Sequence, residues 1–162
     1  MLYNDDMIRS PKRLALSLLI SYGAGALGSL ATFPSIQGWY AELAKPDFNP
    51  PNWVFGPVWT LLYTLMGVAL YIVWQQRSKQ SKRLAFIFFG LQLALNTLWS
   101  VVFFGLHLPL LGVAVIVTLL LAIILTAAMF WQFSKLAASM LIPYIAWVSF
   151  ATALNIAIAV LN

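Results

Sequence analysis

The side chains best suited to chemistry in this 162-residue chain are aromatic rings and amides that lie within long apolar stretches. Gln92, Asn96, Trp99 and Phe103 stand at positions i, i+4, i+7 and i+11, a spacing that places them on one face of a helix. An amide surrounded by lipid must find a hydrogen-bond partner, so we expect this face to point inward. Such a face suits either hydrogen bonds between helices or the binding of a flat apolar ligand.

Two other apolar stretches carry comparable stripes at helical spacing. They are Trp59, Tyr63, Met66 and Leu70, and Trp147, Ala151, Leu154 and Asn155. Ala151 is small enough to leave room beside an indole ring. Aromatic stripes usually serve packing, but seven tryptophans in so short a chain favour a cavity for a flat hydrophobic ligand.

The apolar stretches contain no ionisable acid or base, although ionisable groups are the usual sign of ion or proton paths in membranes. This excludes carboxylate-driven transport, voltage sensing and a retinal Schiff base. The chain has no cysteine and a single histidine, so thiolate metal sites and paired axial haem ligands are also excluded. His107 stands in a short loop where we expect it to be solvated, and we expect no metal site.

The composition indicates an all-α membrane protein, because 62% of the residues are hydrophobic and only 8% are charged. About 20 apolar residues are needed for a helix to cross a bilayer. The uninterrupted stretches predict a single domain, a five-transmembrane-helix bundle, with spans at about 14–34, 53–74, 84–104, 110–131 and 136–161. The first stretch also resembles a signal peptide, but its apolar run is longer than a signal-peptide core.

Basic residues flank these spans and predict the orientation. One side carries eight of them, namely Arg9, Lys12, Arg13, Arg77, Lys79, Lys82, Arg83 and Lys135, and the other side carries Lys45 alone. The positive-inside rule then predicts a cytoplasmic N-terminus and a C-terminus on the outer side. Because the basic residues mark topology, we expect no nucleic-acid partner; the loop at 77–83 could also meet anionic lipid or a cytoplasmic protein.

The first connection, residues 35–52, is longer than the others and rich in proline and aromatic residues. Loops of this kind are usually functional or disordered. Trp39 and Tyr40 favour the membrane interface, so the segment is either an interfacial anchor or a lid over a cavity that opens toward the outer side.

Three blocks of the sequence resemble the translocator protein family, which includes the tryptophan-rich sensory proteins of bacteria and the peripheral benzodiazepine receptor of mitochondria. The blocks are WYAELAKPDFNPPNWVFGPVWTLLYTLMG from Trp39 to Gly67, QLALNTLWSVVFFG from Gln92 to Gly105, and PYIAWVSFATALN from Pro143 to Asn155. They occur in the family's order in a chain with five predicted spans, and they lie in the first loop and in the second, third and fifth spans. The resemblance implies a five-helix bundle, often a homodimer, whose cavity binds porphyrins such as protoporphyrin IX and synthetic isoquinoline carboxamides.

The same resemblance implies which residues bind the ligand. The matching positions are Tyr40, Trp59, Tyr63, Asn96, Trp99, Trp147 and Ala151. In some bacterial members, light-dependent oxidative breakdown of bound porphyrin requires two tryptophans that match Trp59 and Trp147, which makes this pair the candidate catalytic residues. No cofactor is required, because an excited porphyrin and oxygen supply the chemistry.

One departure from the family bears on sterols. Animal members carry a cholesterol motif after the third block, with a tyrosine and an arginine that follow a leucine, whereas here Leu154 is followed by NIAIAVLN. Sterol transport is therefore not expected. The resemblance implies tetrapyrrole handling or stress sensing; the alternatives are a passive transporter of tetrapyrroles or other small apolar molecules and a ligand-regulated scaffold.

Overall fold

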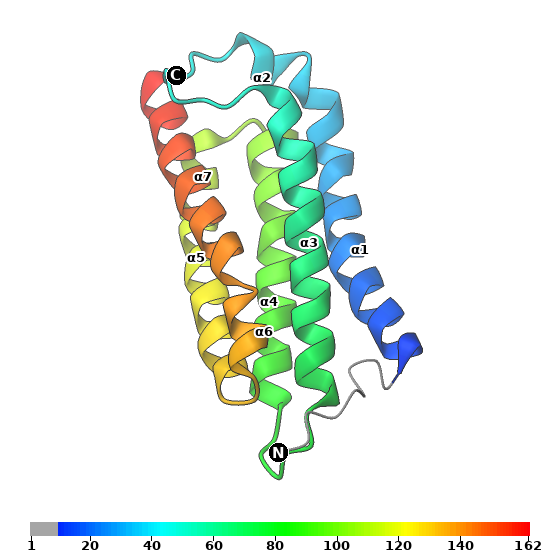
Figure 1. Cartoon of the computed structure of the whole chain (residues 1–162). Helices are drawn as coiled ribbons and strands as arrows, with labels where there is room; N and C mark the ends of the chain where they lie inside the picture. Colours follow the sequence, from blue (N-terminus) through cyan, green and yellow to red (C-terminus); the bar gives the residue numbers. More distant parts are fainter. Residues whose placement is uncertain (1–9) are drawn as a thin grey trace.

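The computed structural model describes residues 10–162 as a bundle of helices (Figure 1). In chain order the elements are α1 (Pro11–Ile36), α2 (Trp39–Glu42), α3 (Asn52–Gln75), α4 (Arg83–Ser100), the π-helical turn η1 (Val101–Gly105), α5 (Pro109–Trp131), α6 (Lys135–Ser139) and α7 (Ile142–Leu161). Five stretches of these residues are long and apolar enough to cross a membrane: 11–36, 52–75, 83–105, 109–131 and 135–161. The predicted all-α bundle with five spans is confirmed.

Local chemistry sets where the helices begin. The Ser10 hydroxyl accepts a hydrogen bond from the backbone N–H of Arg13, and Pro11 occupies the first position of α1, where a missing N–H costs nothing. Pro109 occupies the same position in α5. Ser134 caps α6 through the backbone N–H of Ala137. Each of the first, fourth and fifth spans therefore starts at a residue that the sequence marks.

Two of the spans are less regular than a continuous helix. The third ends in the π turn η1, and the fifth is divided into α6 and α7 at Met140–Leu141. The division falls just before Pro143, which lacks the backbone N–H that a continuous helix would bond to an earlier carbonyl. Pro57 lies inside α3, which begins at Asn52.

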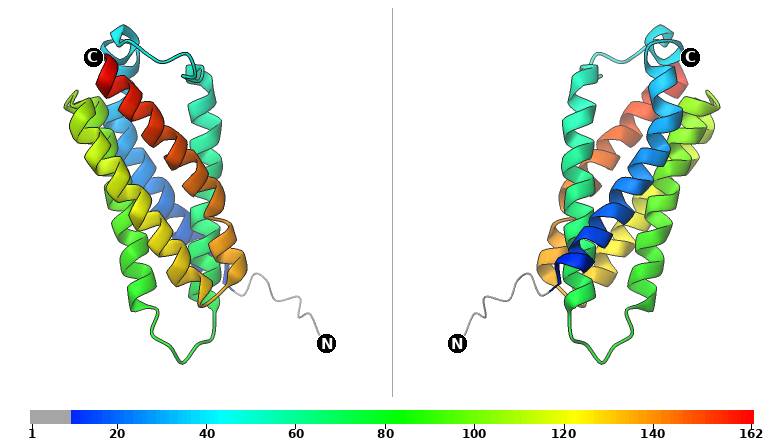
Figure 2. Two further views of the ribbon diagram at one scale, coloured as in Figure 1. Left: turned by 90° about the vertical axis from the view of Figure 1, so that its left-hand side faces the viewer. Right: turned by 90° about the vertical axis from the view of Figure 1, so that its right-hand side faces the viewer.

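The helices form a ring. The first span, α1, packs against α3 and α4; α5 lies between α4 and α7; and α6 contacts α3, which closes the ring at one end (Figure 2). At the other end α7 leans away from α3, as both views in Figure 2 show. The loop 37–51 crosses that end of the bundle.

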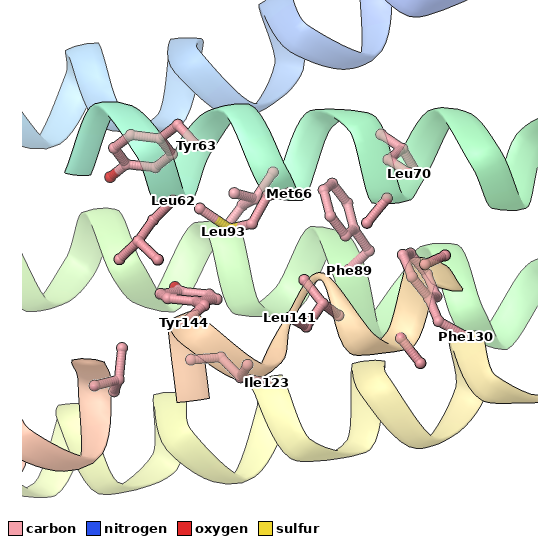
Figure 3. Packing of buried hydrophobic residues seen from close by; sticks show 14 of the residues in the cluster. Leu62, Tyr63, Met66, Leu70, Phe89, Leu93, Ile123, Phe130, Leu141 and Tyr144 are labelled. Carbon is pink, nitrogen blue, oxygen red and sulfur yellow. The ribbon is translucent and has the colours of Figure 1, made fainter. Parts of the chain in front are cut away.

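The close-packed core fills the middle of the bundle and the end where α6 lies. Met66, Ile123, Phe130 and Tyr144 are completely buried there and come from α3, α5 and α7 (Figure 3). The face away from the core is also apolar: Leu110 and Val160, for example, are 78% and 80% exposed. Large apolar side chains left outside in this number indicate a surface that faces lipid.

The charges of the described residues lie at the two ends of the bundle. Lys12, Arg13, the loop 77–83 and Lys135 stand at the ends of α1, α3, α4 and α6 that share one side, while Lys45 and the two carboxylates Glu42 and Asp47 stand on the other. Arg9 lies outside the described residues. The arrangement agrees with the predicted charge asymmetry, and the cytoplasmic assignment of the basic side remains a prediction.

Candidate functional site

A cavity of about 370 Å³ lies between α1, α3 and α4, at the end of the bundle that the first loop covers. It is lined by Gly25, Ser29, Thr32, Phe33, Ile36, Tyr40, Asn52, Trp53, Phe55, Gly56, Trp59, Tyr63, Asn96, Trp99, Ser100 and Phe104. None of these described lining residues is a lysine, arginine, histidine, aspartate or glutamate. The volume lies within the roughly 300–1,000 Å³ of typical small-molecule sites.

A phenol and an amide form the polar group of the cavity. Tyr63 donates a hydrogen bond of 2.7 Å to the side-chain oxygen of Asn96, whose nitrogen donates one of 3.0 Å to the hydroxyl of Tyr144. Asn96 therefore joins α3, α4 and α7 and also lines the cavity. Gly25 of α1 faces the Tyr63 ring so closely that an added Cβ would overlap it. The absence of a side chain at Gly25 lets α1 approach the ring.

Stacked aromatic rings form two walls. On α3, Trp59 stacks on Tyr63 with ring centres 5.4 Å apart. On α4, Trp99 stacks on Phe103 at 5.4 Å, and its indole N–H donates a 3.0 Å hydrogen bond to Asn155. Rings fixed in this way present flat apolar faces, which suit a flat apolar ligand.

The π turn η1 changes which residues reach the cavity. After Trp99 the extra residue of the turn rotates the chain, so that Phe104 lines the cavity while Phe103 is buried beneath Trp99. The two phenylalanine rings pack edge to face at 4.8 Å. Single π turns within α-helices frequently mark functional sites.

The first loop contributes Tyr40 to the cavity. Its hydroxyl donates a 3.0 Å hydrogen bond to Asn49, and the ammonium group of Lys45 lies 4.8 Å from the centre of its ring. Burial raises the pKa of the Tyr40 phenol above its ordinary value, so the hydroxyl stays protonated as a donor. Asn162 holds the loop from the end of α7, because its side chain accepts from the Ala44 N–H and donates to the Ala44 carbonyl, both at 3.0 Å.

The mouth of the cavity lies between α1 and α3. Phe33 and Trp53, which both line the cavity, are 72% and 75% exposed. Tryptophan is enriched at membrane interfaces. The cavity therefore reaches the surface of the bundle beside Phe33 on α1 and Trp53 on α3.

The structure brings five of the seven predicted ligand-binding residues to one cavity. Tyr40, Trp59, Tyr63, Asn96 and Trp99 line it. The other two, Trp147 and Ala151, do not line this cavity. Trp147 packs edge to face on Phe55 at 5.8 Å, and Phe55 does line it, so one ring separates this indole from the cavity. Ala151 is buried in the main core.

The remaining residues of the predicted stripes also face inward. Gln92 is buried, and its amide nitrogen lies 3.7 Å from the sulfur of Met66 on α3. The amides of Gln92 and Asn96 thus connect helices, as one of the two interpretations of this face predicts. His107 is exposed, as expected, but its ring also stacks on Trp39 at 4.4 Å.

Sequence reasoning missed Phe55, Phe104 and Tyr144. Phe55 stands one turn before Trp59, so extending that stripe by four residues would have found it. Phe104 was missed because a regular helix does not place it beside Trp99. Tyr144 stands three residues before Trp147, so extending the third stripe by one turn would have found it. Among the described residues, no group of three or more histidine, cysteine, aspartate or glutamate side chains could hold a metal ion.

A comparison with known protein families shows which family this chain belongs to. The sequence model of the TspO/MBR family matches residues 16–161, which include the first loop, the last four spans and all of the first span after residue 15. The chain belongs to the TspO/MBR family. Together with the five apolar helices, this makes the protein an integral, multi-pass membrane protein of that family.

Family members from distant organisms are similar over most of the chain. The tryptophan-rich protein TspO of Archaeoglobus fulgidus is 48% identical over 150 residues, 93% of this chain and 97% of its own. The tryptophan-rich sensory protein of Cereibacter sphaeroides is 38% identical, with 88% of this chain and 87% of its own covered. The human translocator protein is 43% identical over 72% of this chain and 70% of its own.

Proposed function

We propose that this member of the TspO/MBR family binds porphyrins such as protoporphyrin IX in the cavity between α1, α3 and α4, and acts in tetrapyrrole handling or stress sensing. The observation that carries the proposal is an uncharged cavity of about 370 Å³ whose walls are stacked aromatic rings. A porphyrin macrocycle is flat and apolar, so it gains dispersion and stacking energy between such walls.

The polar groups around the cavity suit the rest of the ligand. The carboxylates of a porphyrin favour the outer end of the cavity, where the ammonium group of Lys45 lies over the Tyr40 ring. The paired Tyr63 and Asn96 satisfy each other and need no polar group from the ligand. The exposed Phe33 and Trp53 at the mouth allow an apolar molecule to pass from the lipid interface without crossing water.

Light-dependent oxidation of the bound porphyrin is a further part of the proposal. In this step the Trp59 indole transfers one electron to the excited porphyrin, and the reduced porphyrin passes that electron to dioxygen to form superoxide. The radical cation of Trp59 then takes one electron back from the macrocycle, and the resulting porphyrin radical cation combines with superoxide, so dioxygen is the oxidant and both of its atoms enter the macrocycle. Trp59 lines the cavity, whereas Trp147 lies behind Phe55, so Trp59 is the direct donor and Trp147 can act only through an intervening ring or after Phe55 moves.

The test of binding is a titration of the purified protein with protoporphyrin IX, followed by quenching of tryptophan fluorescence. The Ser29→Phe variant fills the cavity from α1 and is expected to weaken binding at least tenfold. The matched control Ser139→Phe adds the same ring to the exposed face of α6 and is expected to bind like the parent. Equal affinities for the two variants contradict the assignment of the cavity.

The test of oxidation uses the same protein under illumination. The double variant Trp59→Phe, Trp147→Phe is expected to bind protoporphyrin IX but to stop the light-dependent loss of its Soret band. Of the two single variants, Trp59→Phe is expected to slow the loss more, because only Trp59 lines the cavity. A double variant that bleaches porphyrin as fast as the parent contradicts the oxidative role and leaves the binding proposal standing.

A further inference from the structure

A second hollow lies at the opposite end of the bundle, between the start of α1 and the end of α3. Its volume is about 380 Å³, and it is lined by Ser10, Arg13, Trp74, Gln75, Gln76 and Arg77, which we call the basic notch. The notch is separate from the cavity between α1, α3 and α4, and the two share no lining residue.

The two arginines of the notch carry charges that no described carboxylate neutralises. The only acidic residues in the described part of the chain, Glu42 and Asp47, stand at the other end of the bundle. The guanidinium of Arg13 lies 5.7 Å from the centre of the Trp74 ring and donates to the side chain of Gln75 at 3.4 Å. An arginine has five N–H donors, so this contact fixes the group and leaves donors for a ligand.

Lys82 adds a third positive charge beside the notch. Its ammonium group donates to the carbonyl of Trp74 at 3.2 Å and to that of Gln76, and so caps the end of α3. Partial burial and the charge of Arg13 lower the pKa of Lys82. The N-terminal end of α1 contributes positive potential through its dipole, and the ammonium group of Lys82 offsets the negative potential of the C-terminal end of α3. The field around the notch therefore favours an anion.

The depth of the notch in the membrane selects the kind of anion. The indole of Trp74 forms one wall of the notch. At the same end of the bundle, the ammonium group of Lys135 lies 5.6 Å from the centre of the Trp131 ring. Tryptophan beside basic residues at the ends of spans marks the level of the lipid headgroups. We propose that the basic notch binds the phosphate group of an anionic phospholipid, with Arg13 and Arg77 as its donors.

The test compares phosphatidylglycerol with phosphatidylcholine as bound lipids, counted by native mass spectrometry of the full chain in detergent. The variant Arg13→Gln, Arg77→Gln removes both donors. The control Lys79→Gln, Arg83→Gln removes two charges from the neighbouring loop outside the notch. Arg13 and Arg77 line the notch, so their loss is expected to weaken phosphatidylglycerol binding roughly 25-fold, about fivefold for each residue. Lys79 and Arg83 do not line it, so the control is expected to lose less than about fivefold.

Three outcomes overturn the proposal. Equal losses in the two variants show attraction by net charge alone, and equal binding of the two lipids by the parent shows that the site does not select an anionic phospholipid. If inorganic phosphate occupies the notch while retention of phosphatidylglycerol does not depend on Arg13 and Arg77, the ligand is a soluble phosphate. A circular dichroism spectrum like that of the parent shows that the first variant is folded. The Arg13→Lys, Arg77→Lys variant keeps both charges and is expected to recover most of the lipid binding.

Discussion

Tyr63 on α3 donates a hydrogen bond of 2.7 Å to Asn96 on α4, and both residues line the aromatic cavity. This bond connects the structure of the bundle with its proposed activity. Asn96 also donates to Tyr144 on α7, so one amide holds three helices in register around the ligand space. A hydrogen bond between helices in a membrane contributes about 0.6 kcal/mol on average and at most about 1.7 kcal/mol.

The Asn96→Leu variant is expected to unfold more easily, by about 1–2 kcal/mol, because the phenols of Tyr63 and Tyr144 both lose their partner. Reversible unfolding in mixed micelles, followed by circular dichroism, measures this difference. The Tyr63→Phe variant removes one of the two bonds and is expected to lose about half as much. If Tyr63→Phe is as unstable as Asn96→Leu, the bond to Tyr144 contributes nothing.

Gly25→Ala is expected to weaken protoporphyrin IX binding by about tenfold, because the added methyl group forces the Tyr63 ring to move within the cavity. Gly23→Ala is the matched control on the same helix, since a Cβ at that position meets no atom within 4 Å. Fluorescence titration of both variants gives the comparison. The account of Tyr63 as a fixed wall is wrong if the two variants bind alike.

Gly67→Ala is expected to destabilise the bundle by about 1–3 kcal/mol, because an added Cβ would lie 3.0 Å from the Leu18 backbone and 3.2 Å from the Ser17 carbonyl oxygen of α1. Backbone atoms cannot turn aside as a flexible side chain does, so α1 and α3 must separate. Gly90→Ala, whose Cβ meets nothing within 4 Å, is expected to keep or slightly raise stability. Thermal unfolding of the two variants in one detergent decides between these expectations.

Asn162→Ala is expected to speed the release of porphyrin about threefold or more, because the first loop loses both hydrogen bonds between Ala44 and the end of α7. Stopped-flow recovery of tryptophan fluorescence measures the release rate. Asn162→Asp keeps the acceptor for the Ala44 N–H and is expected to fall between the parent and the alanine variant. Unchanged release in both variants favours the loop as an interfacial anchor over the loop as a lid.

Much of the fold could be predicted because the apolar length of each span and the positions of the charged residues can be read directly from the sequence. Five uninterrupted stretches predict five spans, and an amide such as Asn96 predicts the inward face of its helix, because it cannot remain unpaired in lipid. These arguments need no knowledge of how one helix lies against another. They therefore held for the spans and for the stripe on α4.

The cavity itself could be predicted only in part, since its lining depends on the rotation and tilt of neighbouring helices. The π turn that brings in Phe104, the break before Pro143 and the close approach of Gly67 to Leu18 leave no periodic signal in the sequence. The position of Trp147 behind Phe55 is of the same kind, because it follows from the way α7 leans away from α3. Helix tilt is set by packing against neighbours and cannot be obtained from apolar length.

The most direct test of the proposed function is a structure of the protein with protoporphyrin IX bound in a lipid bilayer. The macrocycle is expected between α1, α3 and α4, in contact with the indoles of Trp59 and Trp99 and beneath Tyr40. A porphyrin on the lipid-facing surface, or one beside Trp147 without contact to Trp59, would contradict the assignment of this cavity as the porphyrin site.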